Sequence, residues 1–182
     1  DGAVYGKGVA WNGLTAVNET PSGAESTKLY ADDIKYLDIR SAEEFGATIE
    51  AYSSPEEFDA CDGTAELADG VNIGQQNRKG FGFCYRSTIG NDTEYNNYGY
   101  KLHIIYGLTA SPSERSYSTV NDSPEAATLS WEVSSTPVNV AGFKPTSIVT
   151  INSKKINPEA LKEIEDALYG TESVEPKILL PD

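Results

Sequence analysis

Over residues 98–108, large apolar side chains occupy every second position, and this regularity constrains the fold more than any other feature of the chain. The alternating set is Tyr98, Tyr100, Leu102, Ile104, Tyr106 and Leu108. A period of two places all six side chains on one face of an extended strand, whereas a helix would spread them around its axis. The sequence therefore predicts a long strand with one buried face.

Shorter segments repeat this alternation. Turn-forming residues cluster at 91–97, 111–113 and 121–124 and divide the middle of the chain into extended pieces. These boundaries predict that strands over 98–108, 114–120 and 127–134 follow one another as a meander. Alternating apolar sets also occur over 44–52 (Phe45, Ala47, Ile49, Ala51), 81–86 (Phe81, Phe83, Tyr85) and 127–134 (Leu129, Trp131, Val133).

Three other stretches have weaker strand signals. Residues 27–40 are interrupted by the turn-prone pair Asp32-Asp33, which predicts two short strands joined by a tight turn. Alternating residues over 147–151 mark the last strand, and 137–145 is interpreted as a loop or weak edge strand.

Two segments carry helix signals. A short helix is predicted near 55–61, because Ser54 is a candidate N-cap and Pro55 is followed by acidic residues. A longer helix is predicted near 158–168, and its apolar stripe should pack on a sheet. Its signals are the cap Asn157, the first-turn Pro158, the stripe Leu161, Ile164 and Leu168, and the stop Gly170.

The length of 182 residues suits one domain. We interpret residues 1–25 as an extended N-terminal arm, 26–170 as the β domain with the two helices, and 171–182 as a C-terminal tail that docks on its own domain or on a neighbour. Cys61 and Cys84 form no CxxC or CxxH pattern, so two reduced, buried or half-buried thiols are expected, and a disulfide between them is the alternative.

The charge balance excludes some functions. The chain has 28 acidic and 14 basic residues, a net charge of −14, and therefore repels polyanions such as nucleic acid. No apolar run reaches the roughly 20 residues that span a bilayer, and no targeting segment is recognised. We expect a soluble protein made in a cytoplasm, with no membrane partner.

The sequence offers little catalytic chemistry. His103 is the one histidine, and it lies on the strand face opposite the apolar set, without a triad-like motif nearby. The acidic cluster Asp59, Asp62, Glu66 and Asp69 lacks the pattern of an EF-hand loop. We therefore expect no enzyme activity, no metal and no cofactor.

Self-association is the more promising function. Eleven tyrosines accompany five phenylalanines, and tyrosine is favoured where a buried ring keeps a wet hydroxyl, notably at subunit contacts. Long strands in an open sheet also present unpaired edges that a partner can cover. The alternative is a monomeric sandwich whose acidic residues and twist protect those edges.

Several segments resemble one protein family. The chain is similar to the major tail (tail tube) proteins of long-tailed, non-contractile bacteriophages. The resemblance covers most of the chain and is strongest over Leu29–Phe58 and Leu161–Asp182. It is carried by the segments LYADDIKYL (29–37), EEFGATIEAY (43–52), PEEF (55–58), EDALYGT (165–171) and LLPD (179–182).

The resemblance implies an antiparallel β-sandwich or split-barrel tail-tube fold with a flanking helix. Six copies would form a ring whose long strands contribute to an intersubunit β-barrel, and stacked rings would form a tube in the virion. Viral DNA would pass through an acidic lumen without specific binding. The implied partners are other copies of the chain and the tail tape measure, tail terminator and distal tail proteins, and the subunit would be made in the host bacterial cytoplasm.

On this view the polar sides of the long strands line the lumen, and stacking uses residues 1–25, 71–79 and the C-terminal tail. The alternative is that the same acidic side chains face solvent outside the tube, since alternation does not say which face is inside. The residues predicted to line the lumen are Glu44, Thr48, Glu50, Ser130 and Glu132.

Two other functions remain open. A tube of a phage-derived bacteriocin or injection device would share all these features. An adhesin or carbohydrate-binding β-sandwich would instead expose Trp11 and Trp131 for stacking on sugars, although the alternation groups Trp131 with buried Leu129 and Val133.

Overall fold

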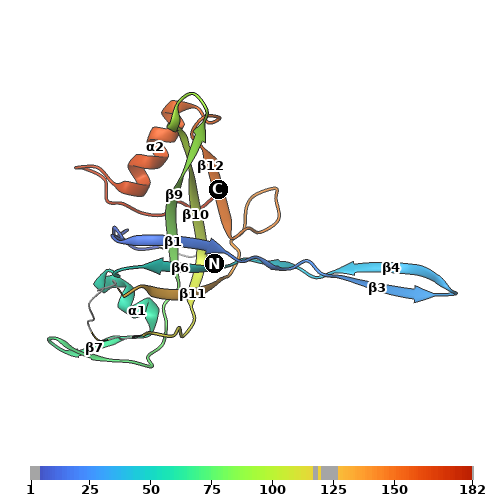
Figure 1. Ribbon diagram of the computed structural model, residues 1–182, viewed down its shortest axis with the longest axis horizontal. Coiled ribbons are helices and arrows are strands. Elements are labelled where there is room, and N and C mark those ends of the chain that lie inside the picture. The colour runs from blue at the N-terminus through green and yellow to red at the C-terminus, as the bar shows by residue number, and fades with distance from the viewer. Residues whose placement is uncertain (1–4, 117–118, 120–126, 182) are drawn as a thin grey trace.

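The computed structural model describes residues 5–116, 119 and 127–181, and its fold is mainly β with antiparallel sheets (Figure 1). The main sheet has the strand order β1-β6-β11-β10-β12, and β9 pairs with the other edge of β10. Its strands are β1 (Leu14–Glu19), β6 (Gly46–Ala51), β9 (Phe81–Asn91), β10 (Tyr95–Ala110), β11 (Leu129–Ser135) and β12 (Ile148–Asn152). The predicted long strand is thus β10, and the alternations over 44–52, 81–86 and 127–134 are also strands.

A sharp bend in β10 divides this sheet into two parts. Over Lys101–Ile105 the strand pairs with β12, and over Leu108–Ala110 it pairs with β11. Gly107 lies between these stretches with φ +59°, and a Cβ there would lie 2.2 Å from the Thr136 carbonyl oxygen. Only glycine fits this site, so Gly107 allows β1, β6 and β11 to cross β9, β10 and β12 steeply (Figure 1).

Two hydrophobic cores result. The first lies between the two parts of the sheet and contains Ile49 and Trp131 on one side with Phe83 and Ile105 on the other. The second lies on the opposite face of β9, β10 and β12. There Leu102, Ile104 and Tyr106 pack against α2, whose residues Leu161, Ile164 and Leu168 face them. The alternating apolar side chains of β10 therefore pack in both cores, Leu108 in the first and Leu102, Ile104 and Tyr106 in the second.

The helix α2 (Pro158–Tyr169) matches the predicted segment near 158–168. The Asn157 side chain accepts a hydrogen bond from the Glu159 N–H at 2.8 Å, which caps the first turn. Beyond the helix, Ile178 and Leu180 pack on the second core, and the Tyr106 hydroxyl donates to the Leu179 carbonyl at 2.9 Å. The C-terminal tail thus docks on its own domain.

The short helical segment near 55–61 consists of the 3-10 turn η1 (Glu56–Phe58) and α1 (Asp59–Asp62). The predicted N-cap Ser54 is wrong, because Pro55 occupies that position and no side chain caps the turn. Phe58 joins the first core, and Gly63 ends the helix with φ +81°.

The main sheet, its two cores and the helices form the body of the molecule. Beyond this body, β1 and β6 continue as one long two-stranded ribbon (Figure 1). The ribbon contains the pair β2 (Ser22–Gly23) and β5 (Glu43–Glu44), then the pair β3 (Ser26–Ala31) and β4 (Ile34–Arg40). Residues 14–19 therefore belong to the main sheet, and an extended arm over 1–25 does not describe them.

Other expectations need correction. The polar stretch before residue 80 contains a small hairpin of β7 (Ala65–Ala68) and β8 (Val71–Ile73). A strand over 114–120 is not formed by residues 114–116, and most of the rest lies outside the described residues. The predicted meander of 98–108, 114–120 and 127–134 is wrong, because β10 pairs directly with β11 and leaves no place between them for a strand over 114–120. Over 137–145 only the bridge Val138 to Thr146 marks extended pairing.

Candidate functional site

The ribbon, residues 21–44, is exposed at every position. Its ladder continues that of β1 and β6: Thr20 N–H donates to Gly46 O at 2.8 Å, and Ser41 N–H donates to Glu25 O at 3.1 Å. At the tip, Asp32 and Asp33 both have positive φ, 52° and 63°, as a tight hairpin turn requires. Counting the residues from Glu19 to this tip, the ribbon extends about 40 Å at roughly 3.3 Å per residue.

The ribbon has one apolar and one polar face. Directly paired residues share a face, so Leu29 and Leu37 lie with Thr27 and Ile39, while Lys28 and Asp38 lie on the other side. Near the tip, Ile34 pairs with Ala31 on the apolar face. The apolar face is therefore continuous from Ile39 to the tip.

The polar face is held together by side-chain bonds. Asp38 accepts hydrogen bonds from Ser26 and Lys35, and these partners hold the pKa of its carboxyl below the ordinary value. With Lys28 and Arg40 also in the two strands, β3 and β4 carry three basic residues against one acid. The β3–β4 pair is therefore locally basic, whereas the whole ribbon is acidic, with six acidic and three basic residues over 21–44.

An isolated two-stranded ribbon is at best marginally stable in water. Yet this one exposes large apolar side chains, including Ile34 at 64% and Ile39 at 50%. Contiguous apolar surface of this kind marks interaction sites or aggregation hazards. Standard protein interfaces use about 20–30 residues from each side, and the ribbon supplies 24 exposed positions, residues 21–44.

A polar cluster lies where the ribbon leaves the body. Glu19, the last residue of β1, accepts a hydrogen bond from the Tyr85 hydroxyl, and its Oε1 lies 3.8 Å from Nδ1 of His103. The Ser87 hydroxyl lies 2.8 Å from Nε2 of His103. These contacts join β1, β9 and β10, so the cluster anchors the root of the ribbon.

This cluster superficially resembles a serine–histidine–carboxylate triad, which sequence reasoning did not foresee. In a triad the carboxylate hydrogen-bonds the ring N–H that orients the base. Here the distance from Glu19 to His103 exceeds hydrogen-bond length, and Tyr85 occupies the carboxylate. Burial lowers the pKa of His103, while the nearby Glu19 opposes that shift. The arrangement fits an anchor between strands better than a nucleophile.

The structure brings four of the five predicted lumen residues together. Thr48 pairs with Glu132, and Glu50 pairs with Ser130, so these side chains share the outer face of β6 and β11. Ala16 and Asn18 of β1 extend the same face, and Asn18 donates to Glu50 at 3.2 Å. Glu44 instead lies in β5 of the ribbon, opposite Ser22. Thus the polar sheet face consists of Ala16, Asn18, Thr48, Glu50, Ser130 and Glu132.

The polar sheet face is negatively charged, since its two ionisable groups are the carboxylates of Glu50 and Glu132. The side chains on the other face of these strands, among them Ala47, Ile49, Trp131 and Val133, are buried in the first core. Beside the face, β1 ends the strand order of the sheet. Its outer edge can therefore accept a strand from another chain.

The acidic cluster and the two cysteines are the other candidate sites that the sequence offers. Asp62, from the acidic cluster, pairs with Arg78 at 3.3 Å and with Arg115. In the part of the chain that the structure describes, no group of three His, Cys, Asp or Glu side chains could hold a metal. Cys61 and Cys84 are free and half-buried, as predicted, and burial raises the pKa of Cys84 to about 11.

No family model, curated protein or solved structure matches this chain. Within the described residues, no helix is long and apolar enough to cross a membrane. The ribbon and the polar sheet face are therefore the candidate functional surfaces of this chain. The sequence indicated the two strands of the ribbon, but not that they project away from both cores.

Proposed function

We propose that this chain is a structural subunit of a phage tail tube, in which hexameric rings stack into a hollow tube that delivers viral DNA. Its role is assembly rather than catalysis. Other copies of the chain are its main partners, and the tail tape measure, tail terminator and distal tail proteins are the others. The assembled protein belongs to the virion, after synthesis in the host bacterial cytoplasm.

The observation that carries this proposal is the projecting ribbon. Its apolar face, with Leu29, Leu37 and Ile39, receives no cover from either core of its own chain. Burying these side chains against another copy gains roughly 25 cal/mol for each Å² of apolar surface. Self-association therefore explains why a 24-residue exposed segment keeps a hydrophobic side.

The polar sheet face supports a lumen wall. Small or short polar side chains with two carboxylates repel a polyanion and offer it no basic partner on that face. If β1 pairs laterally with a neighbouring copy, this face continues around a ring, and closure removes the open sheet edge. In that arrangement Thr48, Glu50, Ser130 and Glu132 line the channel, whereas Glu44 lies at the root of the ribbon.

The tube of a phage-derived bacteriocin or injection device is an alternative with the same geometry, because it needs the same self-assembly. A carbohydrate-binding module is less well supported. Trp131 is 2% exposed, and Trp11 packs edge-on against it with ring centroids 5.2 Å apart. Trp131 therefore offers no open face on which a sugar could stack, and Trp11 is half-buried against Trp131 and Phe58.

Negative-stain electron microscopy of the purified protein tests the proposal. Hollow tubes or six-fold rings are the expected result, and their mass should equal a multiple of six subunits. If the protein remains monomeric at every concentration, including after addition of preformed tail tips that can initiate assembly, the proposed function is wrong.

A further inference from the structure

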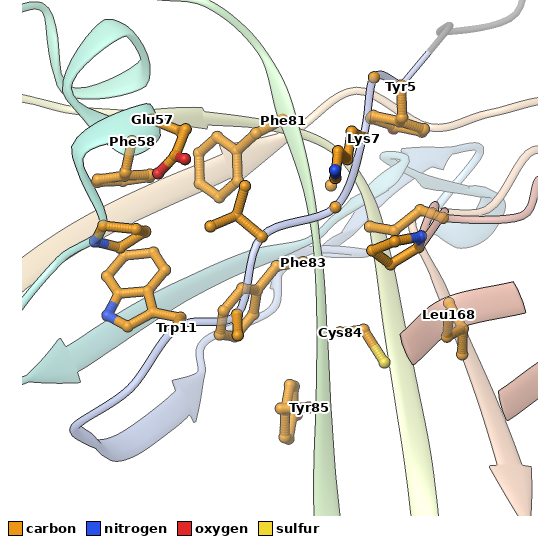
Figure 2. Close-up of a pocket in the computed structure, with 18 of the residues that line it drawn as sticks. Tyr5, Lys7, Trp11, Glu57, Phe58, Phe81, Phe83, Cys84, Tyr85 and Leu168 are labelled. Atoms are coloured by element: carbon orange, nitrogen blue, oxygen red, sulfur yellow. The ribbon is translucent and has the colours of Figure 1, made fainter. Parts of the chain in front are cut away.

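Besides the ribbon, the body has an aromatic groove of about 630 Å³ beside β9 (Figure 2). Trp11, Phe58, Phe81 and Phe83 form one end of its lining, and the ring centroids of Trp11 and Phe58 are 4.6 Å apart. Val9, which also lines the groove, is 48% exposed. The groove thus presents accessible apolar surface that the described chain leaves unfilled.

Charged side chains also line the groove. Lys7 and Arg86 contribute two positive charges, and Glu57 contributes one negative charge. Lys7 makes an exposed ion pair with Glu175 at 3.3 Å, and Arg86 lies over the Tyr100 ring at 4.9 Å. The groove therefore combines an apolar floor with a net positive lining, in a chain whose overall charge is −14.

We propose that the aromatic groove receives the ribbon tip of a second copy of this chain. The contact rests on the proposed self-assembly and specifies where each ribbon binds. Ile34 and the apolar face behind it enter the groove between Val9 and Phe83, and the acidic turn Asp32-Asp33 meets Lys7 and Arg86.

The chemistry of the two surfaces is complementary. The ribbon tip pairs an exposed Ile34 with two adjacent carboxylates, and the groove pairs exposed apolar surface with two cations. Charge complementarity of this kind selects the partner and the orientation of docking more than it adds affinity.

A ribbon cannot reach the groove of its own chain. Leu14, at the start of β1, lines the groove, whereas Glu19, at the end of the same strand, leads into the ribbon. The two features are therefore about 17 Å apart along β1, and the hydrogen-bonded ladder directs the ribbon away from the groove (Figure 1). Only another molecule can bring a ribbon tip to this groove.

Because the ribbon and the groove are different surfaces, their contact is head-to-tail. A bound pair leaves one ribbon and one groove unused, so each contact allows the next copy to join. Such contacts generate rings or filaments, in contrast to a symmetric dimer that is complete with two chains. The groove thus contributes the second half of the repeating contact that a tube requires.

Cysteine cross-linking between two differently tagged proteins tests the contact. Both carry Cys61→Ala and Cys84→Ala; one adds Ile34→Cys on the ribbon, and the other adds Val9→Cys in the groove. Diamide then takes two electrons and two protons from each pair of thiols that meets, forming a disulfide. As a matched control, Leu67→Cys replaces the ribbon cysteine, since Leu67 is similarly exposed at 69% but lies on the β7–β8 hairpin. Circular dichroism confirms that all variants fold.

The expected result is a mixed disulfide between Ile34→Cys and Val9→Cys at least tenfold above the yield with Leu67→Cys. Adding Lys7→Glu and Arg86→Glu to the groove protein should reduce that yield severalfold. Tubes that form while mixed disulfides stay at the control level would overturn the groove assignment and leave the proposed function intact. Absence of both tubes and disulfides would contradict both. A small apolar molecule retained in the native mass spectrum without cross-linking would instead assign the groove to a ligand.

Discussion

Leu29 lies directly opposite Leu37 across the β3–β4 ribbon, yet 44% of one and 47% of the other remain exposed. In a folded domain such a cross-strand pair usually packs against a core. Here the pair lies in a segment that is exposed at every position, so the described residues leave this apolar pair uncovered.

Replacing both leucines with aspartate should abolish self-association without unfolding the body. The pair touches neither core, so the free energy of unfolding should change by less than about 0.5 kcal/mol. Sedimentation velocity should then show monomers where the wild type assembles. The control is Leu67→Asp, an exposed leucine outside the ribbon, which should leave assembly unchanged. Normal assembly of the double variant would contradict an apolar role for the ribbon.

Gly107→Ala should destabilise the body by at least about 2 kcal/mol, since the new Cβ meets backbone 2.2 Å away at a left-handed φ. The Gly107 N–H also donates to the Tyr5 hydroxyl at 2.7 Å, a bond that a shifted bend would lose. Chemical denaturation measures the change. Gly74→Ala, where nothing lies within 4 Å of the added atom, should be nearly neutral. Equal stability of the two variants would show that β10 does not need this bend.

Protonation of His103 should weaken the fold as the pH falls. Burial lowers its pKa, Lys101 lowers it further and Glu19 opposes both, while Tyr85 stacks on the ring with centroids 4.6 Å apart. The native state therefore binds a proton less readily than the unfolded chain, whose histidine titrates near about pH 6.5. Stability is retained above that pH and is lost as the pH falls through the folded pKa.

Urea denaturation at pH 7 and pH 5 measures this effect in the wild type and in His103→Gln, which cannot titrate. The fall in the free energy of unfolding should be smaller in the variant. The carboxylates contribute equally to the fall in the free energy of unfolding of both proteins. The difference between the wild type and the variant therefore measures the contribution of His103. An equal fall in the free energy of unfolding in both proteins would contradict a half-buried, neutral imidazole at the root of the ribbon.

Charge reversal on the polar sheet face tests the lumen. Glu50→Lys and Glu132→Lys together should allow tubes to assemble but should hinder DNA ejection from virions. Purified tubes of this variant should also retain short duplex DNA in pelleting assays at low salt, because lysines attract phosphate. The control reverses the same number of charges at Glu159 and Glu163, which are exposed on α2. Normal ejection from normal virions of the lumen variant would contradict the lumen assignment.

The sequence predicts the local elements well because each depends on nearby residues. The alternation in Tyr98–Leu108 indicates β10, and Asn157 with Pro158 indicates α2. Which strands pair with one another was harder to predict from the sequence. The predicted meander places a strand over 114–120 between the strands over 98–108 and 127–134, whereas β11 pairs directly with β10 and, on its other edge, with β6 from an earlier part of the chain.

The candidate site could be predicted only in part, because it also depends on which strands pair with one another. Alternation places Thr48, Glu50, Ser130 and Glu132 on the faces opposite buried residues, and the structure brings them together. Glu44 fits the same alternation but falls beyond the strand, because β6 begins at Gly46 and Glu44 pairs in β5. The two strands of the ribbon were predicted but their exposure was not, since Leu29 and Leu37 have the pattern of buried positions although no described part of the chain covers them.

The most direct test of the central claim compares electron micrographs of the wild type with those of a variant in which an Asn-Gly turn replaces residues 24–42. The shortened hairpin keeps the β2–β5 pair and both cores, so the body should fold, as circular dichroism would verify. We predict hollow tubes or six-fold rings for the wild type and folded monomers for the variant. Tubes from the shortened protein, or only monomers from the wild type, would contradict assembly through the ribbon.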